Sequence, residues 1–198
     1  MAKTKTPIAG SARAIRSALR NAGLIVLALL ISKGASAEPQ VSIGLLVGGG
    51  AADLRTEPRA VFHMGLHGDV LFLRKRNSDF AIGPYVELLT VAFDTFEMGG
   101  GVSWLIPMSD PIPLVLSAGA HARGGPGGFF PGVSATIWAG SRSYNFSSPY
   151  GLAIGLFVEG RYGFGDANAT QADVLAGLQI DGEIFALPFI FAYNGLFR

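Results

Sequence analysis

The sequence contains no cysteine, so no disulfide bond stabilises the fold. After residue 37 it has a single lysine, Lys75, and no basic patch of the kind that binds nucleic acid. It also lacks, after residue 37, any apolar run of the roughly 20 residues that a membrane-spanning helix needs. These absences argue against a disulfide scaffold, a nucleic-acid partner and a helical inner-membrane protein.

The first 37 residues have the organisation of an export signal. A basic segment without acidic residues precedes the apolar residues 22–31, and Ala35, Ser36 and Ala37 then form the small-x-small site that signal peptidase cleaves. We predict that residues 1–37 are removed and that residues 38–198 form one domain, with an uncleaved N-terminal anchor as the alternative. No cysteine follows the site, which excludes a lipoprotein anchor. The other 161 residues carry a formal net charge of −5.

Residues 61–73 alternate between two kinds of side chain. Phe62 and Met64 are apolar, whereas His63, His67 and Asp69 occupy alternate positions. Successive side chains of a β-strand point to opposite faces of its sheet, so one face is apolar and the other polar. The pattern recurs in most of the later segments, least clearly in the sixth, and no helical pattern longer than two turns follows residue 37. We predict eight strands, in residues 40–49, 60–73, 80–93, 96–106, 114–123, 132–142, 151–163 and 171–184.

These strands and their glycine- and proline-rich turns predict an all-β, antiparallel up-and-down barrel. A transmembrane barrel has its apolar face outside, whereas a soluble lipocalin-like barrel reverses the two faces. The predicted polar faces are rich in glycine and free of lysine, which suits a narrow lumen better than a solvated surface. Eight strands leave an interior just filled by side chains. We therefore predict an eight-stranded transmembrane barrel, with ten strands as the alternative.

The export signal, the eight alternating strands and the aromatic C-terminal region resemble the small bacterial outer-membrane β-barrel superfamily. This superfamily includes outer-membrane proteins A, X and W and the lipid A-modifying barrels. The resemblance covers residues 38–198 and is one of architecture. It implies an integral outer-membrane location, both termini in the periplasm, outer-membrane lipid as the surroundings, and the barrel assembly machinery as a partner during biogenesis.

The C-terminal region departs from this pattern in two ways. Barrels of the superfamily end on an aromatic residue, whereas here Phe197 is followed by Arg198. Residues 184–193 are apolar on both faces and contain Pro188. A lipid-lying tail, a plug and a further strand are the three alternatives for residues 184–197.

The inward face of the predicted barrel holds most of the ionisable side chains of the strands. We interpret them as a salt-bridge and hydrogen-bond network that fills the lumen, because buried charges are tolerated only when they are paired. Carboxylates outnumber arginines, which implies that some of them are protonated, contact histidine or reach water. The predicted lumen network comprises His63, His67, Asp69, Glu87, Glu97, His121, Arg123, Glu159, Arg161, Asp173 and Asp181.

Metal binding and catalysis are the alternative uses of these residues. His63 and His67 are four positions apart on a strand, roughly 13 Å, which is too far to share a metal ion. The superfamily that this chain resembles includes lipid A deacylases, in which a histidine on a lipid-facing strand activates a serine. This sequence has no His and Ser two positions apart on such a strand. Ser117 and His121 share a face but lie too far apart for a hydrogen bond. We predict no catalytic residue, no metal and no cofactor.

Aromatic residues near the strand ends predict girdles at the two membrane interfaces, where amphipathic rings prefer the headgroup region. Ordinary core packing is the alternative. The basic residues 74–76 are predicted to form a solvated periplasmic turn and not a binding site. A loop over 124–131, with Phe129 and Phe130 exposed, is predicted to be a contact surface for a partner or lipid. The predicted girdles comprise Phe62, Phe72, Phe80, Phe93, Phe96, Trp104 and Tyr162.

The sequence as a whole predicts a non-enzymatic integral outer-membrane barrel. Its lumen is expected to be narrow or filled by side chains, and its role to be structural or the passage of small solutes. Two alternatives stay open. One is a lipid A-modifying enzyme of the outer membrane, and the other is a soluble periplasmic lipocalin-like barrel that binds an apolar ligand.

Overall fold

A computed structural model describes residues 39–76, 78–109, 112–125, 128–141, 154–164 and 171–182. The predicted cleavage site after Ala37 and the alternatives for residues 184–197 lie outside these residues. Among the described residues, no helix is long and apolar enough to cross a membrane. The strands are β1 (Gln40–Ala52), β2 (Arg59–Leu71), β3 (Ala81–Val91), β4 (Thr95–Pro107), β5 (Pro113–Gly125), β6 (Gly128–Gly140), β7 (Ile154–Gly163) and β8 (Ala172–Asp181).

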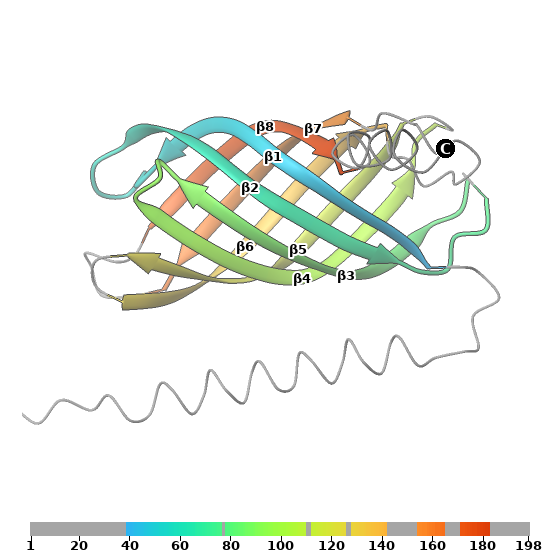
Figure 1. The fold of residues 1–198 in the computed structure, drawn as a ribbon, viewed down its shortest axis with the longest axis horizontal. Helices are drawn as coiled ribbons and strands as arrows, with labels where there is room; N and C mark the ends of the chain where they lie inside the picture. Colours follow the sequence, from blue (N-terminus) through green and yellow to red (C-terminus); the bar gives the residue numbers. More distant parts are fainter. Residues whose placement is uncertain are drawn as a thin grey trace, which may run out of the picture. The chain divides into compact units, whose positions relative to one another are not determined.

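The strands form one closed antiparallel barrel (Figure 1). Each strand pairs with the next along the chain, and β1 also pairs with β8, for example Val47 with Leu178. This closure confirms the predicted all-β up-and-down barrel and its count of eight strands. The start of β1 and the end of β8 lie at one end of the barrel, which we call the terminal end. The β1–β2, β3–β4, β5–β6 and β7–β8 turns lie at the opposite end, which we call the far end.

The β5–β6 hairpin is longer than the sequence predicts. β5 continues to Gly125 and β6 begins at Gly128, so most of the predicted loop over 124–131 is strand. Gly124 pairs with Phe129 across this hairpin. Glycine and proline indicate a loop locally, but here pairing with neighbouring strands outweighs the local preference. The loop prediction is therefore wrong, and Phe129 and Phe130 lie on a strand.

The turn after β2 also differs from the prediction. Lys75 and Arg76 are exposed, but Arg74 is buried, so the turn is only partly solvated. Leu73 has a φ of 72°, and this left-handed conformation interrupts the strand alternation just before Arg74. The sequence pattern carries no signal for such a reversal at a leucine.

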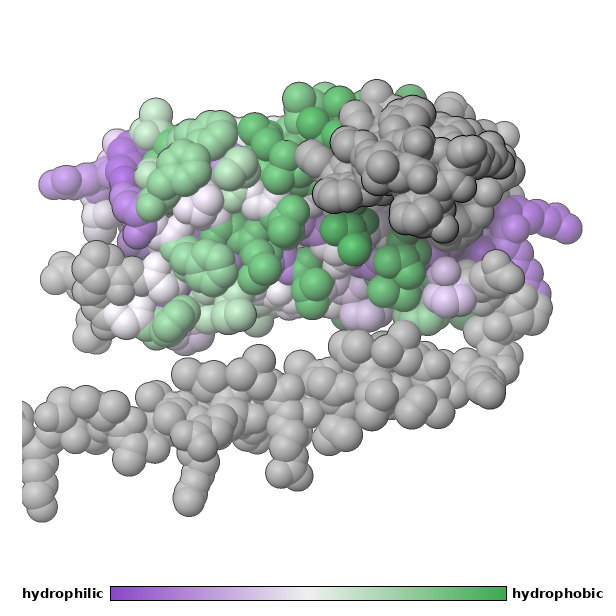
Figure 2. All heavy atoms as spheres, in the orientation of Figure 1, coloured by the Kyte–Doolittle hydropathy of each residue, from purple (hydrophilic) through white to green (hydrophobic). Residues whose placement is uncertain are grey.

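The two faces of the barrel wall differ in chemistry. Inward apolar side chains are buried at both ends of the lumen, with Leu71 and Leu105 near the terminal end and Val61 and Val91 near the far end. Charged and hydroxyl side chains are buried between them. Outward side chains are apolar and exposed, and Figure 2 shows them along the wall, with hydrophilic residues gathered at the two ends. The inward and outward sets follow the sequence alternation.

Glycines on the inward face permit the close packing of this small barrel. A Cβ added to Gly83 would fall far inside contact distance of the Val70 carbonyl oxygen, whereas one added to the outward Gly160 would meet nothing within 4 Å. The absence of a side chain at the inward glycines therefore lets the neighbouring backbone approach closely on the inside of the wall.

We expect Gly83→Ala to lower the free energy of unfolding by about 1–3 kcal/mol, because the clashing atoms belong to the backbone and have little freedom to move. Gly160→Ala, the matched control, is expected to change it by less than about 0.5 kcal/mol. Urea titration of the folded fraction on an unheated detergent gel measures both. Equal effects of the two substitutions would contradict the packing argument.

Candidate functional site

The lumen is organised around the guanidinium group of Arg161 on β7. Its Nη1 donates a hydrogen bond to Glu97 of β4, and its Nη2 donates to Glu87 of β3 and to Glu159 of β7, 3.1 Å away. All four side chains are buried. A guanidinium group presents several N–H donors in one plane, so a single arginine can satisfy three carboxylates from three strands.

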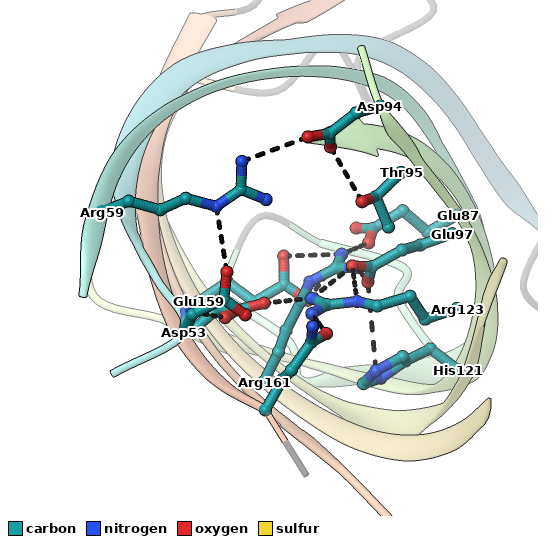
Figure 3. Close-up of polar contacts among 12 residues, drawn as sticks. Asp53, Arg59, Glu87, Asp94, Thr95, Glu97, His121, Arg123, Glu159 and Arg161 are labelled. Atoms are coloured by element: carbon teal, nitrogen blue, oxygen red, sulfur yellow. Dashed lines mark hydrogen bonds and ion pairs between the residues drawn. The ribbon is translucent and has the colours of Figure 1, made fainter. Parts of the chain in front are cut away.

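Arg123 on β5 forms a second centre, nearer the far end. It donates hydrogen bonds to Glu97 and Asp173 and to the side-chain carbonyl of Gln171. Glu97 is thus shared by both arginines, and Asp173 also accepts a hydrogen bond from the backbone N–H of Asp53, at 2.8 Å. Figure 3 shows Arg123, Arg161, Glu87, Glu97 and Glu159 converging in the lumen from different strands.

His67 extends the network toward the terminal end. Its Nδ1 lies 3.3 Å from Glu87, its Nε2 lies 3.7 Å from Asp69, and its ring stacks on Tyr85 with 5.1 Å between centroids. The Tyr85 hydroxyl in turn lies 3.4 Å from the Ser134 hydroxyl. Ionisable groups therefore form a nearly continuous chain from Asp173 through both arginines to Asp69.

The other two histidines are placed differently. His63 is completely buried, and its ring meets Phe157 edge-on at 5.4 Å between centroids. Neither of its ring nitrogens has a hydrogen-bond partner. His121 lies 3.9 Å from Glu97 through Nε2. Thus the structure connects His67 and His121 to the carboxylates, whereas the described ring contact of His63 is with Phe157.

Two further polar contacts lie away from the arginines. Near the terminal end the Ser42 hydroxyl donates to Asp181 at 2.6 Å, and the Ser103 and Ser117 hydroxyls lie 2.8 Å apart. The contact with Asp181 accounts for the last of the eleven residues predicted for the lumen. Every one of the eleven lies on an inward face. Nine of them belong to the network around the two arginines, while Asp181 bonds Ser42 and the His63 ring meets Phe157. Within the described part of the chain, no three His, Asp or Glu side chains are placed to hold a metal ion.

The sequence interpretation missed a smaller charged group at the far end. Arg59 donates hydrogen bonds to Asp53 at 2.9 Å and to Asp94 at 3.1 Å, which ties the β1–β2 turn to the β3–β4 turn (Figure 3). Hydrogen bonds from Arg59 and from Thr95 lower the pKa of the Asp94 carboxyl. The link weakens when this carboxyl is protonated in acid. These residues lie in or beside turns, where alternation gives no direction for a side chain.

The outward aromatic residues lie in two groups. Phe62, Phe93, Phe96 and Tyr162 lie near the far end, and Phe72, Phe80 and Trp104 near the terminal end. Phe62 stacks on Phe93 at 5.7 Å between centroids. Ala92 and Phe93 have φ values of 52° and 60°, and with the hydrogen bond from Asp94 N–H to the Val91 carbonyl they form a tight two-residue turn that normally selects Asn and Gly. The structure adds two exposed rings to the far group, Phe129 and Phe164.

Comparisons of the chain with models of protein families, with curated proteins and with solved structures found no match. The strand pairing establishes the fold, an eight-stranded closed antiparallel β-barrel, without adding a family. The interior of the barrel and its outer wall are the two features that bear on its function.

Removing Arg161 tests whether the lumen depends on its three ion pairs. We expect Arg161→Met to lower the free energy of unfolding by about 3–5 kcal/mol, because it leaves buried carboxylates without a partner. Arg55→Met, a loss of the same charge at an exposed side chain, is expected to cost at most about 1 kcal/mol. Urea titration of both variants measures the free energy of unfolding of each.

A second substitution separates the loss of charge pairing from the loss of packing. Combining Arg161→Met with Glu159→Gln removes one unpaired carboxylate and is expected to recover part of the lost stability. If the double variant is as unstable as Arg161→Met, packing rather than charge pairing explains the effect.

Proposed function

We propose that the protein is a non-enzymatic integral outer-membrane β-barrel. The observation that carries this proposal is the composition of the outer wall. The outward positions of the eight strands bear no charged side chain, and only Thr90 and Tyr162 among them carry a hydroxyl group. An exposed apolar surface that surrounds a whole barrel far exceeds the patches of a few hundred Å² found on soluble monomers.

The height of this apolar surface supports the proposal. On β4 the outward apolar positions run from Phe96 to Ile106. This distance is about 33 Å along a strand, and a tilt of about 40° reduces it to about 25 Å along the barrel axis. Outer-membrane barrels present an apolar band of about 25 Å between aromatic girdles. The two aromatic groups at the far and terminal ends lie where such girdles are required.

The filled lumen favours a structural role over solute passage. The side chains of Arg161, Glu87, Glu97 and Glu159 meet across the lumen and are almost inaccessible to water. The burial of these groups leaves no wide aqueous path beside them. All three histidines of the chain are also buried on inward faces, so no histidine on the outer wall activates a serine toward lipid.

The resemblance to small outer-membrane barrels supplies the orientation. We assign the terminal end to the periplasm, the surroundings to outer-membrane lipid, and assembly to the barrel assembly machinery. Residues 1–37 then act as the cleaved export signal. The far end faces the cell exterior.

A charge placed on the middle of the wall distinguishes a membrane barrel from a soluble one. Val86 lies near the centre of β3 and is 64% exposed. In a bilayer, Val86→Arg is expected to lower the free energy of unfolding by about 2–4 kcal/mol, because the new charge lies in hydrocarbon. In a soluble barrel the same surface substitution would change it by less than about 0.5 kcal/mol.

The matched control is Thr56→Arg, which adds the same charge in the exposed β1–β2 turn. It is expected to leave stability in lipid vesicles nearly unchanged. Equal effects of the two arginines would contradict a lipid-facing wall.

Location and permeability are tested on the complete, exported protein. We expect it in the outer-membrane fraction, with a gel mobility that changes on boiling. Vesicles containing it are expected to swell in isosmotic sugar no faster than vesicles without protein. Recovery of the mature chain in the soluble periplasm would overturn the membrane proposal. Rapid swelling would overturn the structural role alone, and altered lipid A in cells that carry the protein would overturn the non-enzymatic one.

A further inference from the structure

The turn between β2 and β3 presents two exposed positive charges. Lys75 and Arg76 are exposed, and no ion pair to either side chain is found among the described residues. The nearby Asp79 carboxylate instead accepts hydrogen bonds from the backbone N–H groups of Lys75, at 3.1 Å, and Arg76, at 2.9 Å. Asp79 therefore fixes the shape of the turn while both cationic side chains remain available to an external anion.

Apolar side chains flank these cations. Leu73 is 60% exposed and Phe80 is 61% exposed, one on each side of the basic residues. The φ of 72° at Leu73 is a conformation that a leucine adopts at a cost of order 1–3 kcal/mol. Met108 and Ile112, in the neighbouring β4–β5 turn, are exposed as well. The rim at the terminal end thus combines exposed cations with exposed apolar groups.

This turn continues the apolar outer wall. Phe72 bridges to Ile82 of β3, and Ile82 pairs with Trp104 of β4. Trp104 is outward-facing and 57% exposed, and neighbouring strands lie about 4.8 Å apart. A lipid whose chains lie along the wall beside Trp104 therefore has its headgroup at the level of the β2–β3 turn.

We propose that the β2–β3 turn binds the phosphate group of an anionic phospholipid in the leaflet at the terminal end. Lys75 and Arg76 supply the charge, and Leu73 and Phe80 enter the boundary between headgroups and acyl chains. The proposal rests on the membrane location proposed above and adds a lipid preference to it. Clusters of basic and apolar residues at a membrane surface recognise anionic lipids in this way, with about 1 kcal/mol per cation.

Trp104 is a built-in reporter of this binding. The chain has two tryptophans, and the other, Trp138, is buried in the lumen and shielded from lipid. The barrel is inserted into vesicles that contain either phosphatidylglycerol or phosphatidylcholine with brominated acyl chains, which quench an adjacent tryptophan. We expect phosphatidylglycerol to bind about 5 to 30 times more tightly than phosphatidylcholine. This range corresponds to a factor of about five for each of the one or two cations that contact the headgroup.

The variant K75Q/R76Q is expected to reduce this ratio to about 1, and salt at about 1 M, where the Debye length is about 3 Å, is expected to reduce it in the wild type. Arg55→Gln, which removes a cation from the far end, is expected to leave the ratio unchanged. Trp104→Phe is expected to abolish the quenching, which assigns the signal to this interface.

The outcomes separate this proposal from the membrane proposal. Quenching by both lipids with a ratio of about 1 in the wild type, or a high ratio that persists in K75Q/R76Q, would overturn the lipid preference while the membrane location stands. Absence of quenching by either lipid would overturn the membrane location, and the lipid preference with it.

Discussion

The pairing of β1 with β8 is the constraint on which the rest of the structure depends. Because it closes the sheet, each strand has a neighbour on both sides and the backbone groups of the wall are satisfied within the wall. Only such a wall can present an apolar surface all around itself without exposing an unpaired strand edge. Closure by eight strands also limits the width of the interior, and therefore the volume of the side chains that it can hold.

The narrow interior is filled by small residues and by arginines that each bind more than one carboxylate. Gly83 and other inward glycines leave room where the wall curves, and Arg161 and Arg123 each bind several carboxylates from different strands. Glu97 contacts both arginines, so it links the two centres into one network. Polar groups thus tie strands together across the lumen. An interior made only of apolar side chains would fill the space without fixing which strands face one another.

Much of this architecture could be predicted from alternation alone. A period of two assigns each residue of a strand to one face, so it predicts that His67, Glu87 and Arg161 lie inward. The period does not fix height along the barrel or the direction of a side chain beyond a strand end. Alternation therefore does not predict that the His63 ring nitrogens lack a hydrogen-bond partner, that Arg59 links to Asp94, or that Arg74 is buried. The loop predicted at 124–131 failed because glycine and proline report a local preference that neighbouring strands override.

Two of the hairpins at the far end are short. β3 and β4 are joined through Ala92, Phe93 and Asp94, and β5 ends only two residues before β6 begins. In the orientation proposed above, these two hairpins project little beyond the wall on the cell surface. Antibodies, phage and added proteases would then find little of β3, β4, β5 and β6 to contact there.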